Sequence, residues 1–171
     1  KQKVPTRKLL EDPYHFWYIG KSYYDSTLGD YPLGMDHIKE YARRSIFYFA
    51  QYLNFKHDYH NTGKAKEIDE LAYFALYAMG DMFKLSNNYE KALDCGMRAE
   101  EFAPSRNEHI VLQAECYKDL SDFDSMKIQT NRLMSPDRKL PFPQYNFLLN
   151  MEHYNDSGKY CEQLHQIANQ V

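Results

Sequence analysis

The sequence has little of what marks secreted or membrane-spanning proteins. Its three cysteines, Cys95, Cys116 and Cys161, are widely spaced and form no Cys-x-x-Cys pair, which excludes a dense secreted disulfide framework. No apolar run approaches the roughly 20 residues that a membrane span requires, and no apolar signal segment stands at the start. We therefore expect a soluble protein of a reducing, cytoplasmic compartment.

An excess of positive charge is also missing. The chain carries 21 Lys and Arg against 24 Asp and Glu, for a formal net charge of -3. Nonspecific affinity for nucleic acid comes from clustered basic residues, so a nucleic-acid partner is not expected. A length of 171 residues fits a single domain that can bury a core without disulfides. The chain starts at Lys1 rather than at an initiator methionine, which indicates a segment upstream that was removed.

Amphipathic helices are abundant, and the stretch from Tyr73 to Pro104 predicts a helical hairpin broken at Ser-Asn-Asn. Small residues occupy the helix faces that should meet, because two helices approach closely only where side chains are short. A mid-helix glycine otherwise costs about 1 kcal/mol, so Gly80 and Gly96 need a packing reason. The positions expected on these two faces are Leu76, Met79, Gly80 and Phe83, then Ala92, Leu93, Gly96 and Ala99.

The hairpin pattern returns 34 residues later. Leu76 maps onto Ile110, Gly80 onto Ala114 and Phe83 onto Tyr117, and the second helices correspond as Tyr89 to Phe123, Ala92 to Met126 and Ala99 to Leu133. A period of about 34 is that of the tetratricopeptide repeat. Tyr73 to Pro104 resembles one such repeat, with these signature positions: Leu76, Met79, Gly80, Phe83, Ala92, Ala99 and Pro104.

An earlier copy begins at Tyr-His-Phe-Trp-Tyr-Ile-Gly, where Phe16, Ile19, Gly20 and Tyr23 repeat the first half of the signature. Gly20 and Gly80 are about 26 residues further apart than one period. We place this insertion in an extended helix through Ile-Phe-Tyr-Phe-Ala-Gln-Tyr-Leu-Asn-Phe and in the polar loop that follows it.

The fold expected is therefore all-α: a right-handed stack of about three helical hairpins with an insertion after the first and a C-terminal capping helix. One repeat domain spans 1–171, with repeats at about 13–64, 73–104 and 107–138 and a cap at 142–171. The cap should turn Tyr160, Leu164, Ile167 and Ala168 toward the stack.

Equivalent positions of the first helices should line the concave face of such a stack as rungs. The rungs are Trp17/Tyr77/Val111, Lys21/Asp81/Glu115 and Tyr24/Lys84/Lys118. An aromatic edge with mixed charge would suit a peptide or a partner helix, and a merely solvated helix face is the alternative. Arg106 is a further candidate, because its planar guanidinium can bind a phosphate or a neighbouring domain. Its local alternative is a role beside a capping box formed by Ser105 and Glu108.

No residue set predicts catalysis or metal binding. His57 and His60 have a spacing found among metal ligands, but no third ligand is evident, and a solvated loop is the better interpretation. Cys161 and His165 lie one helical turn apart without a group to orient the histidine, so Cys161 is expected to be packed. No cofactor is expected in this chain.

Three ordered elements of the sequence resemble the C-terminal repeat region that follows the catalytic domain in some family 2 glycosyltransferases of bacteria and giant viruses. The matching positions are His15, Tyr18, Gly20, Ser22, Tyr23 and Asp25 in the first element, Glu70, Tyr73, Leu76, Tyr77 and Gly80 in the second, and Pro104, Arg106 and Glu108 in the third. The resemblance implies that the sugar-nucleotide site, with its Asp-x-Asp metal motif, belongs to an upstream domain.

Two functions remain open on this evidence. The first is a noncatalytic repeat domain of a glycosyltransferase, serving acceptor binding, docking to the catalytic domain or dimerisation. Its partners would be the upstream catalytic domain, a protein or glycan acceptor, and a second copy of the chain. The second is a free-standing scaffold that binds a peptide or helix in its concave groove.

Overall fold

The computed structural model describes residues 13–29, 35–55, 65–135 and 137–151, together with Tyr160, Glu162, Leu164 and His165. Within these residues the chain forms seven helices and no strand, which confirms the all-α prediction. The helices are α1 (Pro13–Leu28), α2 (Met35–Phe55), α3 (Ala65–Leu85), α4 (Tyr89–Phe102), α5 (Glu108–Asp119), α6 (Phe123–Leu133) and α7 (Phe142–Asn150).

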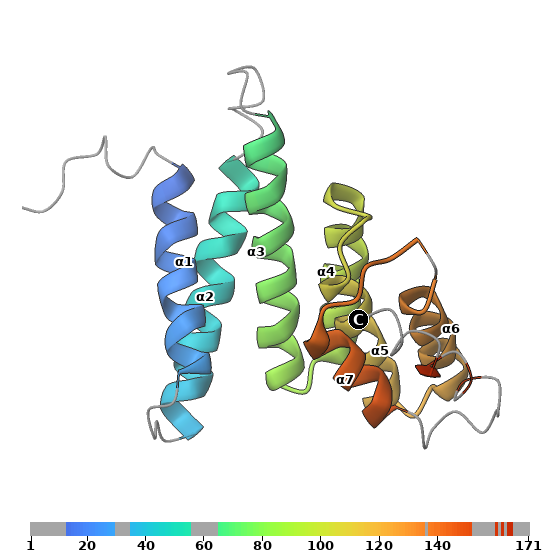
Figure 1. Cartoon of the computed structure of the whole chain (residues 1–171). Coiled ribbons are helices and arrows are strands. Elements are labelled where there is room, and N and C mark those ends of the chain that lie inside the picture. Colours follow the sequence, from blue (N-terminus) through green and yellow to red (C-terminus); the bar gives the residue numbers. More distant parts are fainter. Residues whose placement is uncertain are drawn as a thin grey trace, which may run out of the picture.

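The helices pack in chain order. From α1 to α6 each helix contacts the next, and α1 also contacts α3 while α3 contacts α5. Figure 1 shows α1, α2 and α3 side by side, with α4 to α7 continuing the array. The described residues therefore form a row of consecutive helical hairpins in which α1, α3 and α5 are the first helices.

The turns of the second and third hairpins have the same backbone. Asn87 and Ser121 are 34 residues apart, and both adopt a left-handed conformation, with φ of 58° and 61°. The next residues, Asn88 and Asp122, are N-caps whose side chains accept from the backbone N–H three residues on. Their own N–H groups reach back to Phe83 and Tyr117, each at 2.9 Å. The 34-residue spacing is thus a repeat of structure as well as of sequence.

Glycine in the first helices allows the hairpins to pack closely. A Cβ at Gly80 would collide with the buried side chain of Leu112 and lie 3.3 Å from the carbonyl oxygen of Ala92. A Cβ at Gly20 would meet the ring of Phe49 at 2.9 Å. The packing reason expected for Gly80 is confirmed: α3 is held between α4 and α5 at a distance that leaves no room for a methyl group.

The core has two main parts. One, centred on Phe49, Tyr52 and Leu76, joins α1 to α3 and reaches α4. The other is formed by α5, α6 and α7 around Ile110, Met126, Leu133 and Leu148, and it includes the side chains of Tyr160 and Leu164. Tyr160 also donates a hydrogen bond from its hydroxyl to the carbonyl oxygen of Leu148, at 2.8 Å. These two residues lie against the stack as the sequence predicts, whereas Ile167 and Ala168 are outside the described residues.

Two boundaries differ from expectation. The helix of the second repeat starts at Ala65, about two turns before Tyr73, so part of the insertion lengthens α3 as well as α2. The prediction of a Ser105 cap is wrong: the N-cap of α5 is Asn107. Glu108 accepts from the backbone N–H of Asn107 at 3.2 Å and from the Arg106 guanidinium at 3.3 Å. The carboxylate of Glu108, the first residue of α5, therefore accepts the backbone N–H of the N-cap residue Asn107.

Candidate interaction face of the first helices

Five of the predicted rung residues meet in one polar network across α1, α3 and α5. The Tyr24 hydroxyl on α1 donates to Asp81 Oδ2 on α3 at 2.8 Å. Lys84 Nζ, one turn along α3, lies 3.7 Å from Asp81 Oδ1 and forms an ion pair with Glu115 on α5. The network therefore links the first helices of three successive hairpins, and both contacts between helices join residues of neighbouring rungs rather than of the same rung.

Tyr77 is the fifth member of this network, and its phenol is mostly enclosed. Burial, the charge of Asp81 and the neighbouring Tyr24 raise the pKa of Tyr77 well above its ordinary value. Burial and the Asp81 carboxylate do the same to the pKa of Tyr24. Both phenols consequently stay protonated at any physiological pH and act as hydrogen-bond donors rather than as bases.

The ammonium group of Lys84 is stabilised by two carboxylates. Burial by itself would lower the pKa of Lys84, but the charges of Glu115 and Asp81 outweigh it and raise the pKa above its ordinary value. One cation thus faces two anions in a partly buried site, with Lys84 27% exposed and Asp81 16% exposed. Charge pairs sheltered from water in this way are harder to screen with salt than surface pairs.

Trp17 and Tyr24 are not available to a ligand in this structure. Their side chains are 9% and 7% exposed and belong to the core. The indole N–H of Trp17 donates to the carbonyl oxygen of Leu71 at 3.0 Å, and its ring packs against Phe74 with centroids 5.4 Å apart. These two aromatic residues therefore pack α1 against α3.

The accessible part of the predicted face is charged. Lys21 pairs with Asp25 one turn along α1, with 38% and 54% of the two side chains exposed. At the end of α5, Lys118 lies 3.7 Å from Asp119. Val111 on α5 is partly exposed. The face thus carries paired positive and negative side chains, and Lys84 and Glu115 of the network are about as exposed as Lys118.

Arg106 lies in a different cluster from the rungs. Its guanidinium stacks over the ring of Tyr73, 4.7 Å from the centroid, and pairs with Glu108 at 3.3 Å. The Tyr73 hydroxyl in turn donates to Glu108 at 3.0 Å. Arg106 therefore joins the loop before α5 to α3, and about half of its side chain remains exposed.

The sequence interpretation missed two residues beside this cluster. Arg138 donates to the carbonyl oxygens of Pro104 and Arg106, at 3.0 and 2.9 Å, so the chain after α6 is tied to the loop before α5. His109 is fully buried next to Tyr73, and burial lowers its pKa to about 4. The sequence offers a partial indication of the place of Arg138, because it lies 34 residues after Pro104 and so at the equivalent position in the next repeat.

Among the residues that the structure describes, no group of three His, Cys, Asp or Glu side chains lies close enough together to hold a metal ion. His57, His60 and Cys161 fall outside those residues. None of the described helices has the length and apolar character needed to cross a membrane. Comparison of the chain with protein-family models and with curated proteins gave no match.

Proposed function

We propose that this chain is a noncatalytic helical-repeat module, of the tetratricopeptide type, that serves a glycosyltransferase by docking against another protein domain. Its docking surface is the charged face of α1, α3 and α5. The stack of hairpins in this proposal is right-handed, and the partner is the catalytic domain that the sequence resemblance places upstream.

The observation that carries this proposal is the network from Tyr24 through Asp81 and Lys84 to Glu115. The network joins the three first helices to one another. The charged side chains of Lys21, Asp25 and Lys118 do not belong to it and remain partly accessible to a partner. A rigid face with mixed charge favours a complementary protein surface, because electrostatic complementarity sets orientation and association rate. The repeated turn at Asn87 and Ser121 supports the same repeat class.

A binding titration tests the docking surface. The 171-residue chain is titrated into the separately produced catalytic domain by isothermal calorimetry. Lys118→Glu should weaken binding about tenfold, because it reverses one partly exposed charge on the face. Arg98→Glu is the matched control, since Arg98 is an exposed cation on α4, a second helix, and forms an ion pair with Asp94 of the same helix. If both variants bind equally weakly, or if both keep the full affinity, the docking surface does not lie on this face.

An activity assay tests the noncatalytic assignment. The isolated chain should release no nucleotide diphosphate from UDP-sugars with Mn²⁺ or Mg²⁺, whereas the protein that includes the upstream domain should do so. Such transfer needs a metal to neutralise the departing diphosphate and a base for the acceptor hydroxyl. Turnover by the isolated chain would contradict the assignment.

A free-standing scaffold that binds a charged peptide is the second candidate. The mixed charge of Lys21, Asp25 and Lys118 along the face favours it, because an extended peptide of alternating charge would find complementary groups there. The two candidates separate in the activity assay: a parent protein that neither binds nor hydrolyses a nucleotide sugar supports the scaffold.

A further inference from the structure

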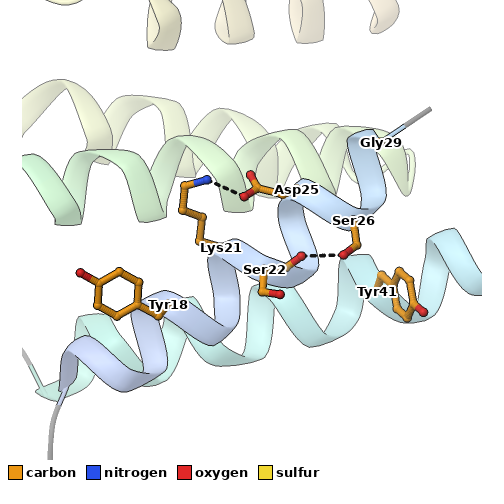
Figure 2. Close-up of a pocket in the computed structure, with 7 residues that line it drawn as sticks. All are labelled: Tyr18, Lys21, Ser22, Asp25, Ser26, Gly29 and Tyr41. Atoms are coloured by element: carbon orange, nitrogen blue, oxygen red, sulfur yellow. Dashed lines mark hydrogen bonds and ion pairs between the residues drawn. The ribbon is translucent and has the colours of Figure 1, made fainter. Parts of the chain in front are cut away.

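A hollow of about 750 Å³ is lined, among the described residues, by side chains of α1, by Gly29 just after it and by Tyr41 in the first half of α2. None of these residues belongs to the polar network. Figure 2 shows Tyr18 and Tyr41 toward its two ends, with Lys21, Ser22, Asp25 and Ser26 between them. A second hollow of about 420 Å³ shares Tyr18, Ser22, Ser26 and Tyr41 with the first. The two hollows therefore form one continuous depression in the surface.

The tyrosine rings at the ends are held in place by other aromatic side chains. Tyr18 is 65% exposed, and its ring meets Trp17 edge to face, with centroids 5.3 Å apart. The Tyr41 ring packs against Tyr23 at 5.7 Å and near His37 at 6.5 Å. These contacts favour particular orientations of the two rings, which lowers the side-chain entropy that stacking of a ligand costs.

The floor between the rings carries hydroxyl groups. Ser22 and Ser26 lie one helical turn apart, and the Ser26 hydroxyl donates to the carbonyl oxygen of Ser22 at 2.8 Å, which leaves its oxygen lone pairs free to accept. Tyr18 and Ser26 are two turns apart, about 12 Å along the helix axis. The depression is thus longer than one six-membered ring.

The charge of the lining argues against an anionic ligand. The one ammonium group, on Lys21, is paired with the Asp25 carboxylate, so the two charges cancel. A phosphate or carboxylate ligand is recognised by unpaired Arg or Lys groups, and the described lining of the larger hollow offers none.

The chemistry of the lining also argues against a hydrophobic helix. The described lining of the larger hollow includes no aliphatic side chain, and that of the smaller one includes a single aliphatic residue, Ile19. An amphipathic helix binds in a groove lined by several such groups. What remains complementary is a neutral ligand that presents apolar C–H faces to the two rings and hydroxyl groups to the serines.

We infer that this depression binds a neutral oligosaccharide, with sugar rings on Tyr18 and Tyr41 and sugar hydroxyls hydrogen-bonded to Ser22, Ser26 and the Lys21–Asp25 pair. The site shares the Lys21–Asp25 pair with the charged face but does not include Lys118. Only the biological role of the bound sugar, as acceptor or product, rests on the proposed function.

Ligand-observed NMR on the full 171-residue chain tests the site with maltotetraose, cellotetraose, chitotetraose and mannotetraose at millimolar concentration. At least one should show saturation transfer from the protein, and Tyr18→Ala should weaken its binding about tenfold. Tyr18→Phe should keep the affinity, because the ring remains, whereas Tyr18→Leu should lose it, because an aliphatic group has no aromatic face.

Phe47→Ala is the matched control. Phe47 is an exposed aromatic residue on the same hairpin, at 56% exposure, and does not line either hollow. Binding should survive this change. The inference is overturned if none of the four tetrasaccharides binds, or if Tyr18→Leu binds as well as Tyr18→Phe. Neither result affects docking measured with Lys118→Glu, so the two proposals fail separately.

Discussion

Asn87 and Ser121 hold the same left-handed backbone conformation, one repeat apart, at the turn between the two helices of successive hairpins. In each turn the N–H of the left-handed residue donates to a carbonyl oxygen near the end of the first helix, from Asn87 to Lys84 and from Ser121 to Lys118, both at 2.9 Å. A left-handed residue costs L-amino acids about 1–2 kcal/mol, and Asn tolerates it better than most. The two turns therefore have the same geometry, but the turn at Ser121 is more strained than the turn at Asn87.

Ser121→Gly should stabilise the protein by about 0.5–1 kcal/mol, since glycine adopts a positive φ without a Cβ penalty. Asn87→Gly should gain less, because Asn87 also accepts a hydrogen bond from the Tyr89 hydroxyl at 3.1 Å. Urea denaturation gives both free energies of unfolding. A Ser121→Gly variant less stable than the unmodified protein would show that the turn is not strained.

Gly80→Ala should destabilise the protein by about 1–2 kcal/mol, although alanine is the better helix former by about 1 kcal/mol. The reason is the collision of the new methyl group with Leu112 in the buried contact between α3 and α5. Gly96→Ala is the control: its nearest neighbour, Gln113 Cγ, is 3.0 Å from the new methyl group, so the contact is milder and the stability should fall less. The two variants are compared by chemical denaturation, and equal stability would contradict the close packing at Gly80.

Lys84→Met should lower the free energy of unfolding by about 1–3 kcal/mol, because it leaves Asp81 and Glu115 partly buried without a cation. Adding Glu115→Gln should recover part of the loss, since it removes one of the two uncompensated charges. Lys118→Met should change the stability by no more than about 0.5 kcal/mol. A double-mutant cycle measured by thermal denaturation gives the coupling energy, and additive effects would show that Lys84 and Glu115 do not interact.

Stability should fall as the pH is lowered below 6.5, because His109 binds a proton more readily in the unfolded chain. Its folded pKa is about 4, below the ordinary value of 6.5, so below pH 6.5 the unfolded chain takes up a proton on His109 while the folded chain keeps the ring neutral. The stability that this group contributes is therefore fully present only above pH 6.5. Between pH 6.5 and about pH 5 the loss from this group should be about 1.5 kcal/mol.

The surroundings of His109 are mixed in charge. Glu100 on α4 lies 3.9 Å from Nε2, and Glu108 is at the start of the same helix. The positive charges of Arg132 and Arg138 oppose protonation, and Arg132 is itself paired with Glu100. His109→Gln is the comparison variant, measured by urea denaturation at each pH. If that variant loses as much stability over this window as the unmodified protein, another group is responsible.

The sequence alone determined the helices, the 34-residue repeat and the small residues between helices. These features depend on contacts within a hairpin, where periodicity and turn residues such as Asn88 and Asp122 act on neighbours a few positions away. The burial of Tyr160 and Leu164 was predictable for the same reason, since an amphipathic face requires a partner.

Only the tertiary structure decided which polar residues of the first helices pair and which aromatic ones are buried. Lys84 and Glu115 are 31 residues apart, and Tyr24 and Asp81 are 57 apart. Whether such side chains touch depends on how far one hairpin is shifted and rotated against the next. Because of the insertion between the first two hairpins, a repeat alignment does not give the relative position of α1 and α3. Burial of Trp17, Tyr24 and His109 follows from the same docking of hairpins, because a side chain loses its contact with water only when the neighbouring helix covers it.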